Sequence, residues 1–394
     1  MRSVQNKRKI CINTLIGSYN YGNRLQHFAL DRLLRQEGME TVYWSDFHVR
    51  ELSMRKHAAS WKQTVKRLVP YRVYLLFMRV GIAEKQFLQS PDLAGRKMNF
   101  RRFNRQYLPN GSRMYAKTLD TLHRKIAREG IDFFIAGSDQ VWNPRWNGNG
   151  YQFLNFAPPS RRLSFSASFG IQEIPENLRA EYAGYLADMR YISVREQRGV
   201  EIVKELTGRD AELTPDPTLL LQREEWDKAV DTVRMALPEQ YIAAYFLGET
   251  PKAVYDFAKK KGLPLIELNR RDRKKWYSVD PLQFLYILRS ARYVLTDSFH
   301  GTAFSLKFEK EFYVFRRSDG AGMFSRIETL ASMFDLWDRV QDETSVREAL
   351  PVTEEKWRAV RDELEQRRAL AMEGLMRAMD VRVQKEGNTG KHEA

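Results

Sequence analysis

Short apolar runs and helical repeats of apolar residues alternate from the start of the chain. Residues 9–16 alternate between apolar and polar side chains, which predicts a strand, and a polar turn over residues 17–23 follows it. Apolar residues then recur at helical spacing from Leu25 as far as Gly38, a residue typical of helix ends. Because residues 41–44 predict a second strand, the chain opens as a βαβ unit.

The same alternation returns twice further along. Short apolar runs at 131–136, 162–168 and 191–194 each end in small or polar residues, as buried parallel strands do. A second series predicts strands at 241–247, 263–268, 293–296 and 312–315, with a helix over 251–261. The pattern therefore predicts an α/β protein with two domains built on parallel sheets.

Domain boundaries follow from where this pattern stops. We expect an N-terminal α/β domain over 1–215, a connection over 216–238 and a C-terminal α/β domain over 239–350. Residues 47–130 interrupt the first domain with 19 Lys+Arg against 5 Asp+Glu, and we expect a basic helical insertion there. A long charged helix over 351–385 and a disordered tail over 386–394 complete the prediction.

Composition adds an uneven charge to this picture. The 394 residues are 43% hydrophobic and carry a formal charge of +15. Residues 1–130 hold 26 Lys+Arg and 9 Asp+Glu, a net of +17, whereas residues 131–394 hold 39 and 41, a net of −2. Such a basic segment attracts nucleic acid, an anionic membrane or an acidic polymer, although a solvated helical face explains it equally well.

Cysteine content and hydropathy limit the compartment. The single cysteine, Cys11, excludes an internal disulfide and a multi-cysteine metal site, and we expect it to be buried in the first strand. The start of the chain has no apolar region typical of a signal peptide, so we expect a cytoplasmic protein. The most apolar stretch, 73–78, is far shorter than the roughly 20 residues that cross a bilayer.

Polar side chains gather where four predicted elements meet a turn. The first group is Asn20, Gly22 and Asn23, whose backbone and amides can approach a ligand, although an Asx turn with an N-cap explains them too. The second group, Ser138, Asp139 and Gln140, follows a buried strand, and capping of a short helix is the alternative.

The third and fourth groups carry cationic chemistry. Arg195 lies at a strand end, where it can bind a carboxylate or phosphate through two nitrogens, or form a structural ion pair. Ser298, His300, Gly301 and Thr302 occupy a junction between a strand and a helix, where an imidazole can titrate and backbone N–H groups can bind an anion. The carboxyl ends of parallel strands form the usual ligand site of such sheets.

Several kinds of site have no sequence support. The other histidines are scattered without metal-ligand spacing, and neither a Walker loop nor a Gly-x-Ser-x-Gly motif occurs, so we expect no metal and no acyl-transfer nucleophile.

Six segments in order along residues 10–340 resemble the polysaccharide pyruvyl transferase family. They occupy residues 17–23, 136–144, 164–170, 192–196, 216–220 and 296–304. The resemblance implies two Rossmann-like domains facing a cleft, as in the glycosyltransferase-B architecture. It also implies phosphoenolpyruvate as donor, a sugar or lipid-linked oligosaccharide as acceptor, and a cyclic pyruvate ketal with phosphate as products.

The resemblance also suggests roles for individual residues. Arg195 and His300 map to the basic residue and the histidine that family members use for the donor, and no cofactor is implied. We expect His300 to act as the acid that protonates the donor or its leaving phosphate, and Asp139 to deprotonate or orient the acceptor. Ser298, Gly301 and Thr302 would contribute further donor contacts.

Other functions remain open on the sequence. A nucleotide-sugar glycosyltransferase can share the same fold, and it would release a nucleoside diphosphate instead of phosphate. Nucleic-acid binding is disfavoured because the polar groups lie at sheet ends and no nucleic-acid module is recognisable. Residues 61–87 mix Lys and Arg with aromatic and apolar side chains, so this part of the chain is a candidate for contact with an anionic membrane surface.

Overall fold

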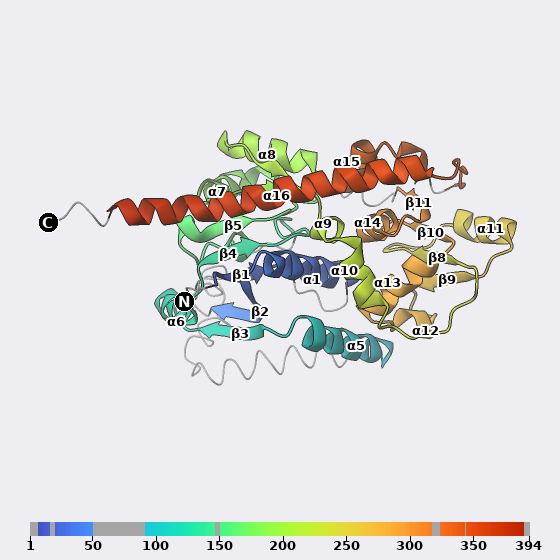
Figure 1. The fold of residues 1–394 in the computed structure, drawn as a ribbon, viewed down its shortest axis with the longest axis horizontal. Helices are drawn as coiled ribbons and strands as arrows, with labels where there is room; N and C mark the ends of the chain where they lie inside the picture. The colour runs from blue at the N-terminus through green and yellow to red at the C-terminus, as the bar shows by residue number, and fades with distance from the viewer. Residues whose placement is uncertain are drawn as a thin grey trace, which may run out of the picture.

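Two five-stranded parallel sheets lie beside each other along the long axis of the molecule (Figure 1). The structure is a computed structural model that describes residues 7–15, 20–49, 91–145, 150–316, 324–342 and 344–389. The first sheet belongs to the N-terminal half and the second to the C-terminal half, with helices packed on both.

The first sheet has the strand order β3-β2-β1-β4-β5, and every neighbouring pair is parallel. Its strands are β1 (Lys9–Asn13), β2 (Glu40–Val49), β3 (Gly111–Ala116), β4 (Phe133–Ala136) and β5 (Arg162–Ser164). A parallel pair, β6 (Ser193–Val194) and β7 (Glu212–Leu213), continues beyond β5 through isolated bridges. Among the described residues, the helices of this half are α1 (Tyr21–Gln36), α5 (Pro91–Tyr107), α6 (Leu119–Glu129), α7 (Glu176–Ala187) and α8 (Gln197–Thr207).

The second sheet has the order β12-β11-β10-β8-β9, again all parallel. Its strands are β8 (Ile242–Tyr245), β9 (Leu265–Leu268), β10 (Tyr293–Thr296), β11 (Glu311–Phe315) and β12 (Val340–Gln341). The helices that precede or flank it are α9 (Pro217–Leu220), α10 (Arg223–Val230), α11 (Lys252–Lys261), α12 (Lys274–Tyr277), α13 (Pro281–Ser290), α14 (Phe299–Lys307) and α15 (Ser325–Phe334).

In each sheet the direction in which successive strands are added changes at one point, and ligands of parallel sheets bind at such points. The first reversal lies between β1 and β4, and the second between β8 and β10. The reversal leaves a crevice at the carboxyl ends of the two strands, because the connections leave them in opposite directions. Ser138 and Asp139 follow β4 and Ser298 follows β10, so predicted site residues stand at both reversals.

The two halves are joined by a buried aromatic and cationic contact. The hydroxyl of Tyr21 in α1 donates to the carbonyl of Val279 at 3.1 Å, and its ring stacks on Phe284 of α13 at 4.3 Å. The guanidinium of Arg96 in α5 lies 4.4 Å from the Tyr21 ring and 4.7 Å from the Tyr277 ring, and it donates to Asn269. These contacts hold α1 and α5 of the first half against the second.

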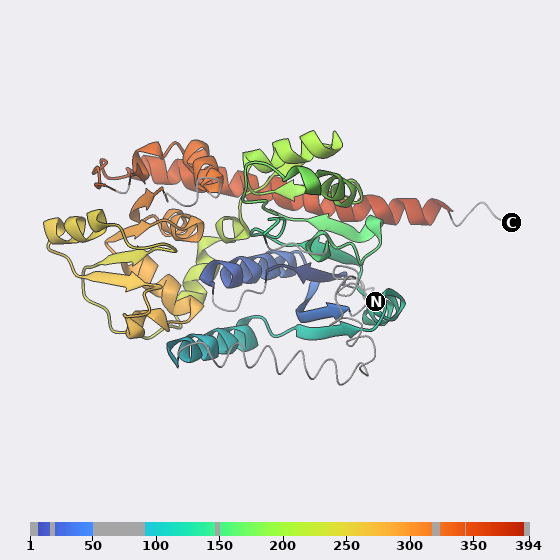
Figure 2. The same cartoon turned by 180° about the vertical axis from the view of Figure 1, so that it is seen from behind.

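A long C-terminal helix, α16 (Glu354–Thr389), crosses from the second half to the first (Figures 1 and 2). It begins beside the second sheet and ends beyond the first, on the same side as the N-terminus. Leu375 and Met379 are fully buried against the first half, where the side chain of Arg190 also donates to the helix carbonyl of Ala378. No helix among the described ranges is long and apolar enough to cross a membrane.

The structure confirms the predicted fold class and most of the predicted strands. Two parallel α/β sheets and a long C-terminal helix are present, and Cys11 is buried in β1 as expected. The helix continues through Thr389, so the predicted tail is wrong over 386–389, and residues 390–394 lie outside the described ranges.

The predicted helical insertion is wrong at both of its ends. Strand β2 extends to Val49, and residues 111–129 form β3 of the first sheet and the helix α6 that follows it. Strand β3 was missed because it is an edge strand whose first three residues are exposed, so it lacks a continuous apolar run. Residues 50–90, which hold the whole of the proposed membrane-contacting stretch 61–87, lie outside the described ranges.

Candidate functional site

Polar side chains from both sheets meet between the two halves of the molecule. Ser138 and Asp139 follow β4, Arg195 follows β6, and Ser298 and His300 lie at the end of β10 and the start of α14. All five residues are buried. The structure therefore brings the main predicted site residues of the two domains into one cluster.

The carboxylate of Asp216 connects the members of this cluster. Its Oδ2 accepts a hydrogen bond from Nη1 of Arg195 at 2.6 Å and one from the hydroxyl of Ser138 at 2.6 Å. The same oxygen lies 3.7 Å from Nε2 of His300. Burial acts to raise the pKa of Asp216, but the imidazole of His300 and the guanidinium of Arg195 hold it well below its usual range.

Arg195 forms structural ion pairs with Asp139 and Asp216, which is the alternative that the sequence left open beside anion binding. Besides its bond to Asp216, its Nη2 lies 3.3 Å from Oδ1 of Asp139, and its guanidinium stands 4.4 Å from the ring of Phe299. Burial acts to lower the pKa of Arg195, whereas Asp216 and Asp139 raise it above its ordinary value. Both terminal nitrogens face carboxylates, so a substrate anion would have to compete for them.

Asp139 is held in a single orientation. Its backbone adopts a left-handed conformation with φ of 79°, and its Oδ1 accepts from the backbone N–H of Gln140 at 2.9 Å. Its Oδ2 accepts from the amide of Asn23 at 2.5 Å. Burial acts to raise the pKa of Asp139, but the charges of Arg195 and His300 lower it. The described residues that directly follow Asp139, 140–145, form turns and no helix, so helix capping does not explain this residue.

The N-terminus of α1 approaches the imidazole very closely. Asn20 is the exposed N-cap of this helix and accepts from the N–H of Asn23 at 3.3 Å, as the capping alternative predicted. Gly22 faces His300, and a Cβ atom on Gly22 would lie 2.0 Å from Nδ1 of the imidazole. Only glycine therefore fits at this position without displacing the ring.

The predicted anion-binding N–H groups at the start of α14 already have partners. Ser298 is the N-cap of α14 and accepts from the N–H of Gly301 at 3.5 Å, and its carbonyl accepts from the N–H of Thr302 at 3.0 Å. The N–H groups of Phe299 and His300, the two residues before Gly301, have no partner among the described residues. The donors that remain open at this helix end are therefore those of Phe299 and His300.

Two charged residues of the cluster escaped the sequence analysis. The guanidinium of Arg326, in α15, lies 5.8 Å from the Phe299 ring. Its Nη2 and Nη1 donate to the side-chain amide oxygen of Gln140 at 2.6 and 3.2 Å when that oxygen faces Arg326. Glu196 accepts at Oε1 from the hydroxyl of Ser168 and from two backbone N–H groups. Asp216 was visible only within a resembling segment, because Asp before Pro is an ordinary helix start.

The cluster offers proton transfer and charge stabilisation. The imidazole of His300, the carboxylates of Asp139 and Asp216 and the guanidinium of Arg195 are buried and linked by close contacts, and open N–H groups lie beside them at a helix N-terminus. The guanidinium of Arg326 lies nearby, 5.8 Å from the Phe299 ring. Among the described residues no group of three or more His, Cys, Asp or Glu side chains has the arrangement of a metal site. Such a set of groups suits an anionic substrate whose charge is redistributed during the reaction.

The chain is similar to UDP-GlcNAc 2-epimerase from Methanocaldococcus jannaschii, with 10% identity, a TM-score of 0.47, and coverage of 91% of this chain and 92% of that one. It is also similar to UDP-GlcNAc 2-epimerase from Neisseria meningitidis bound to UDP-GlcNAc, with 8% identity, a TM-score of 0.45, and coverage of 94% and 100%. No protein of curated function matches the sequence.

The family comparison is more specific. Residues 20–319 match the family model described as polysaccharide pyruvyl transferase. The match includes the N-terminus of α1, the turn after β4, Arg195, Asp216 and the start of α14, so it contains every member of the cluster except Arg326. The chain therefore belongs to the polysaccharide pyruvyl transferase family.

Proposed function

We propose that this transferase moves pyruvate from phosphoenolpyruvate to two hydroxyls of a sugar in a bacterial surface-polysaccharide precursor. The products are a cyclic pyruvate ketal and phosphate. Family membership supports pyruvyl transfer in general. The observation that carries the rest is the position of His300, which lies at the start of α14 between the two sheet reversals, 3.7 Å from Asp216.

The reaction needs an acid beside the donor. Protonation of the methylene carbon of phosphoenolpyruvate generates a cationic centre at C2, one sugar hydroxyl adds there, phosphate leaves, and the second hydroxyl closes the ketal. One hydroxyl proton replaces the proton given to the methylene carbon, and the other leaves with phosphate. A buried imidazole paired with a carboxylate can supply and recover such a proton. We assign this role to His300, with the carboxylate of Asp216 as its neighbour at 3.7 Å.

The donor is an anion and needs positive partners. The N–H groups of Phe299 and His300 are open at the start of α14, and the guanidinium of Arg326 lies 5.8 Å from the Phe299 ring, so in our proposal these groups bind the donor. In our proposal Arg195 contributes mainly by fixing Asp139 and Asp216, because both carboxylates already occupy its terminal nitrogens. A direct bond from Arg195 to the donor would require one of these ion pairs to open.

Asp139 orients the acceptor in this scheme. The charges of Arg195 and His300 lower its pKa, and a carboxylate with a lowered pKa is a weak base. It remains a good hydrogen-bond acceptor for a sugar hydroxyl. Asn23 holds the same carboxylate at 2.5 Å, so a hydroxyl bound to it would have a defined direction.

The basic first third fits an anionic acceptor. The part of this segment that the structure describes exposes Arg101, Arg102 and Arg105 on α5, together with Met98. We propose that this face attracts a lipid-linked acceptor at an anionic membrane surface, consistent with a cytoplasmic protein that binds the membrane peripherally. Co-sedimentation with vesicles of anionic lipid, compared with zwitterionic vesicles, tests this part of the proposal.

The experiment for the function is to incubate the protein with phosphoenolpyruvate and a panel of lipid-linked and nitrophenyl sugars. We expect a pyruvate adduct on a sugar by mass spectrometry and an equal amount of released phosphate. The variant His300→Gln should abolish both while leaving the unfolding temperature within a few degrees of the native protein, because its side chain still fills the space beside Gly22.

His123 provides a matched control. It is exposed, pairs with the carbonyl of Phe156 on the first half, and lies outside the cluster, so His123→Gln should turn over normally. Full activity of His300→Gln would contradict our assignment of the acid. Release of a nucleoside diphosphate from a nucleotide sugar, without phosphoenolpyruvate turnover, would favour a glycosyltransferase instead.

A further inference from the structure

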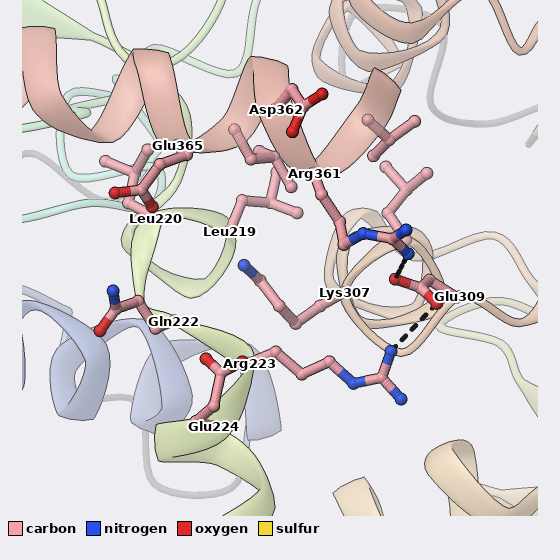
Figure 3. Close-up of a pocket in the computed structure, with 13 residues that line it drawn as sticks. Leu219, Leu220, Gln222, Arg223, Glu224, Lys307, Glu309, Arg361, Asp362 and Glu365 are labelled. Carbon is pink, nitrogen blue, oxygen red and sulfur yellow. Dashed lines mark hydrogen bonds and ion pairs between the residues drawn. The ribbon is translucent and has the colours of Figure 1, made fainter. Parts of the chain in front are cut away.

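A cavity of about 350 Å3 lies at the end of α14 opposite to His300 (Figure 3). It is enclosed by α14, by α9 and α10 of the connection, and by the C-terminal helix α16. Its volume is at the lower end of the range for small-molecule sites. One wall is aliphatic and consists of Leu219, Leu220, Leu306, Val360 and Leu364.

The ammonium of Lys307 points into this cavity from α14 (Figure 3). No hydrogen bond or ion pair connects it to any described residue. The neighbouring cations differ in this respect, because Arg223 and Arg361 both bind Glu309, at 3.1 and 2.7 Å (Figure 3). Among the described residues that line this cavity, Lys307 is therefore the cation that has no carboxylate in direct contact with it.

Charged groups on the surrounding helices do not compensate for this. Glu224 of α10 and Glu365 of α16 attract Lys307 from a distance, whereas Arg223 and Arg368 repel it. Glu365 is itself bound by Arg368 at 2.5 Å. Burial, as the largest effect, lowers the pKa of Lys307 to about 8.

We propose that this cavity binds a small monocarboxylate whose carboxylate pairs with Lys307 and whose short aliphatic body packs on the leucine and valine side chains. One unmatched ammonium suits a single negative charge. A dianion would meet the nearby carboxylates Glu224 and Glu365, and no second free cation faces it, since Glu309 occupies Arg223 and Arg361. This site is separate from the proposed pyruvyl transfer site and does not depend on that function.

Binding should be coupled to uptake of a proton. A carboxylate beside Lys307 favours the charged amine, so at pH 8 to 9 the protein should take up a fraction of a proton as the ligand binds. The affinity should fall as the pH rises above 8. Titration calorimetry in two buffers with different ionisation enthalpies measures this uptake directly.

The test uses the full chain and three probes, hexanoate, hexanol and inorganic phosphate, followed by calorimetry or ligand-detected NMR. We expect saturable binding of hexanoate at one site, with hexanol and phosphate at least tenfold weaker. Lys307→Met should weaken hexanoate binding at least tenfold, and Lys307→Arg should restore it. Lys228→Met, on the same α10 that borders the cavity but outside its lining, is the matched control and should bind as the native protein does.

A second variant separates charge from space. Leu364→Phe keeps Lys307 and fills part of the cavity, so it should also weaken hexanoate binding, while an unchanged circular dichroism spectrum shows that it folds. Absence of hexanoate binding to the native protein would overturn the proposal. So would equal binding of hexanol, or hexanoate binding that Lys307→Met leaves unchanged.

Discussion

Replacing Gly22 by alanine gives the sharpest test of the site geometry. The added Cβ would lie 2.0 Å from Nδ1 of His300 and 2.5 Å from Cε1 and Cγ, whereas ordinary contacts of this kind begin near 3.4 Å. The imidazole must therefore move by 3.4 − 2.0, or about 1.4 Å, unless α1 and α14 separate by a similar amount. Either movement changes the 3.7 Å contact between His300 and Asp216.

The magnitude follows from this displacement. A misplacement of about 1 Å in a catalytic group costs roughly a hundredfold in rate, so Gly22→Ala should lower phosphate release by about that factor. Alanine is a better helix former than glycine by roughly 1 kcal/mol, so α1 itself should not be weakened. The loss should therefore appear in turnover far more than in the extent of folding.

Gly184 supplies the matched control for this variant. It also lies inside a helix, α7, but no atom comes within 4 Å of the position that its Cβ would occupy. Gly184→Ala should keep full activity and gain up to about 1 kcal/mol of stability in urea unfolding. NMR signals of the His300 imidazole give a readout that needs no substrate. Native turnover and native imidazole signals in Gly22→Ala would refute the contact between α1 and α14.

Three further predictions concern stability and follow from buried charges. Asp216→Asn removes a partner of buried Arg195 and should cost about 3–5 kcal/mol in urea unfolding; a loss below 1 kcal/mol would contradict the buried pair. Because folding lowers the pKa of Asp216, its charged carboxylate stabilises the folded state at neutral pH, and this stabilisation is lost as the pH falls below about 4. The free energy of unfolding of the native protein should therefore fall more below pH 4 than that of Asp216→Asn. The pKa of Lys307 is lowered to about 8 from 10.5, so native stability should rise between pH 8 and 10.5 by up to about 3 kcal/mol relative to Lys307→Met; parallel pH profiles would refute this. Arg96→Met removes a cation held between two tyrosine rings and should cost about 2 kcal/mol, and an unchanged denaturation midpoint would show that this contact does not join the halves.

The strands that the sequence predicted correctly are those whose residues are buried on both faces. Strands β4, β10 and β11 are buried except for the first residue of β10 and of β11, and each contains a short apolar run that identifies it. Strand β3 lies at the sheet edge with half of its residues exposed. Its sequence therefore does not form a continuous apolar run. Strand β5 is shorter than its apolar run, because Ser166 takes a positive φ of 54° and interrupts the ladder.

The positions of the site residues were predictable, whereas their partners were not. The rule that ligands bind beyond the carboxyl ends of parallel strands selects Ser138, Asp139 and His300 from sequence alone. The pairing of Arg195 with Asp216 joins residues 21 positions apart, and its pairing with Asp139 spans 56 positions. No local pattern encodes such contacts, so the sequence left anion binding and a structural ion pair as equal possibilities for Arg195.

These contacts form a chain of unequal strength between the two halves. The side chains of Arg195 and Ser138, in the first half, each bind the Asp216 carboxylate at 2.6 Å. The imidazole of His300, in the second half, lies 3.7 Å from the same carboxylate. If the halves separate, we expect the 3.7 Å contact to be lost before the two 2.6 Å hydrogen bonds, because it is longer and therefore weaker. Opening would therefore uncouple the proposed acid from its carboxylate and leave the acceptor-orienting Asp139 in place. In the proposed reaction, the imidazole would then be paired with Asp216 only while the two sheets face each other around the bound substrates.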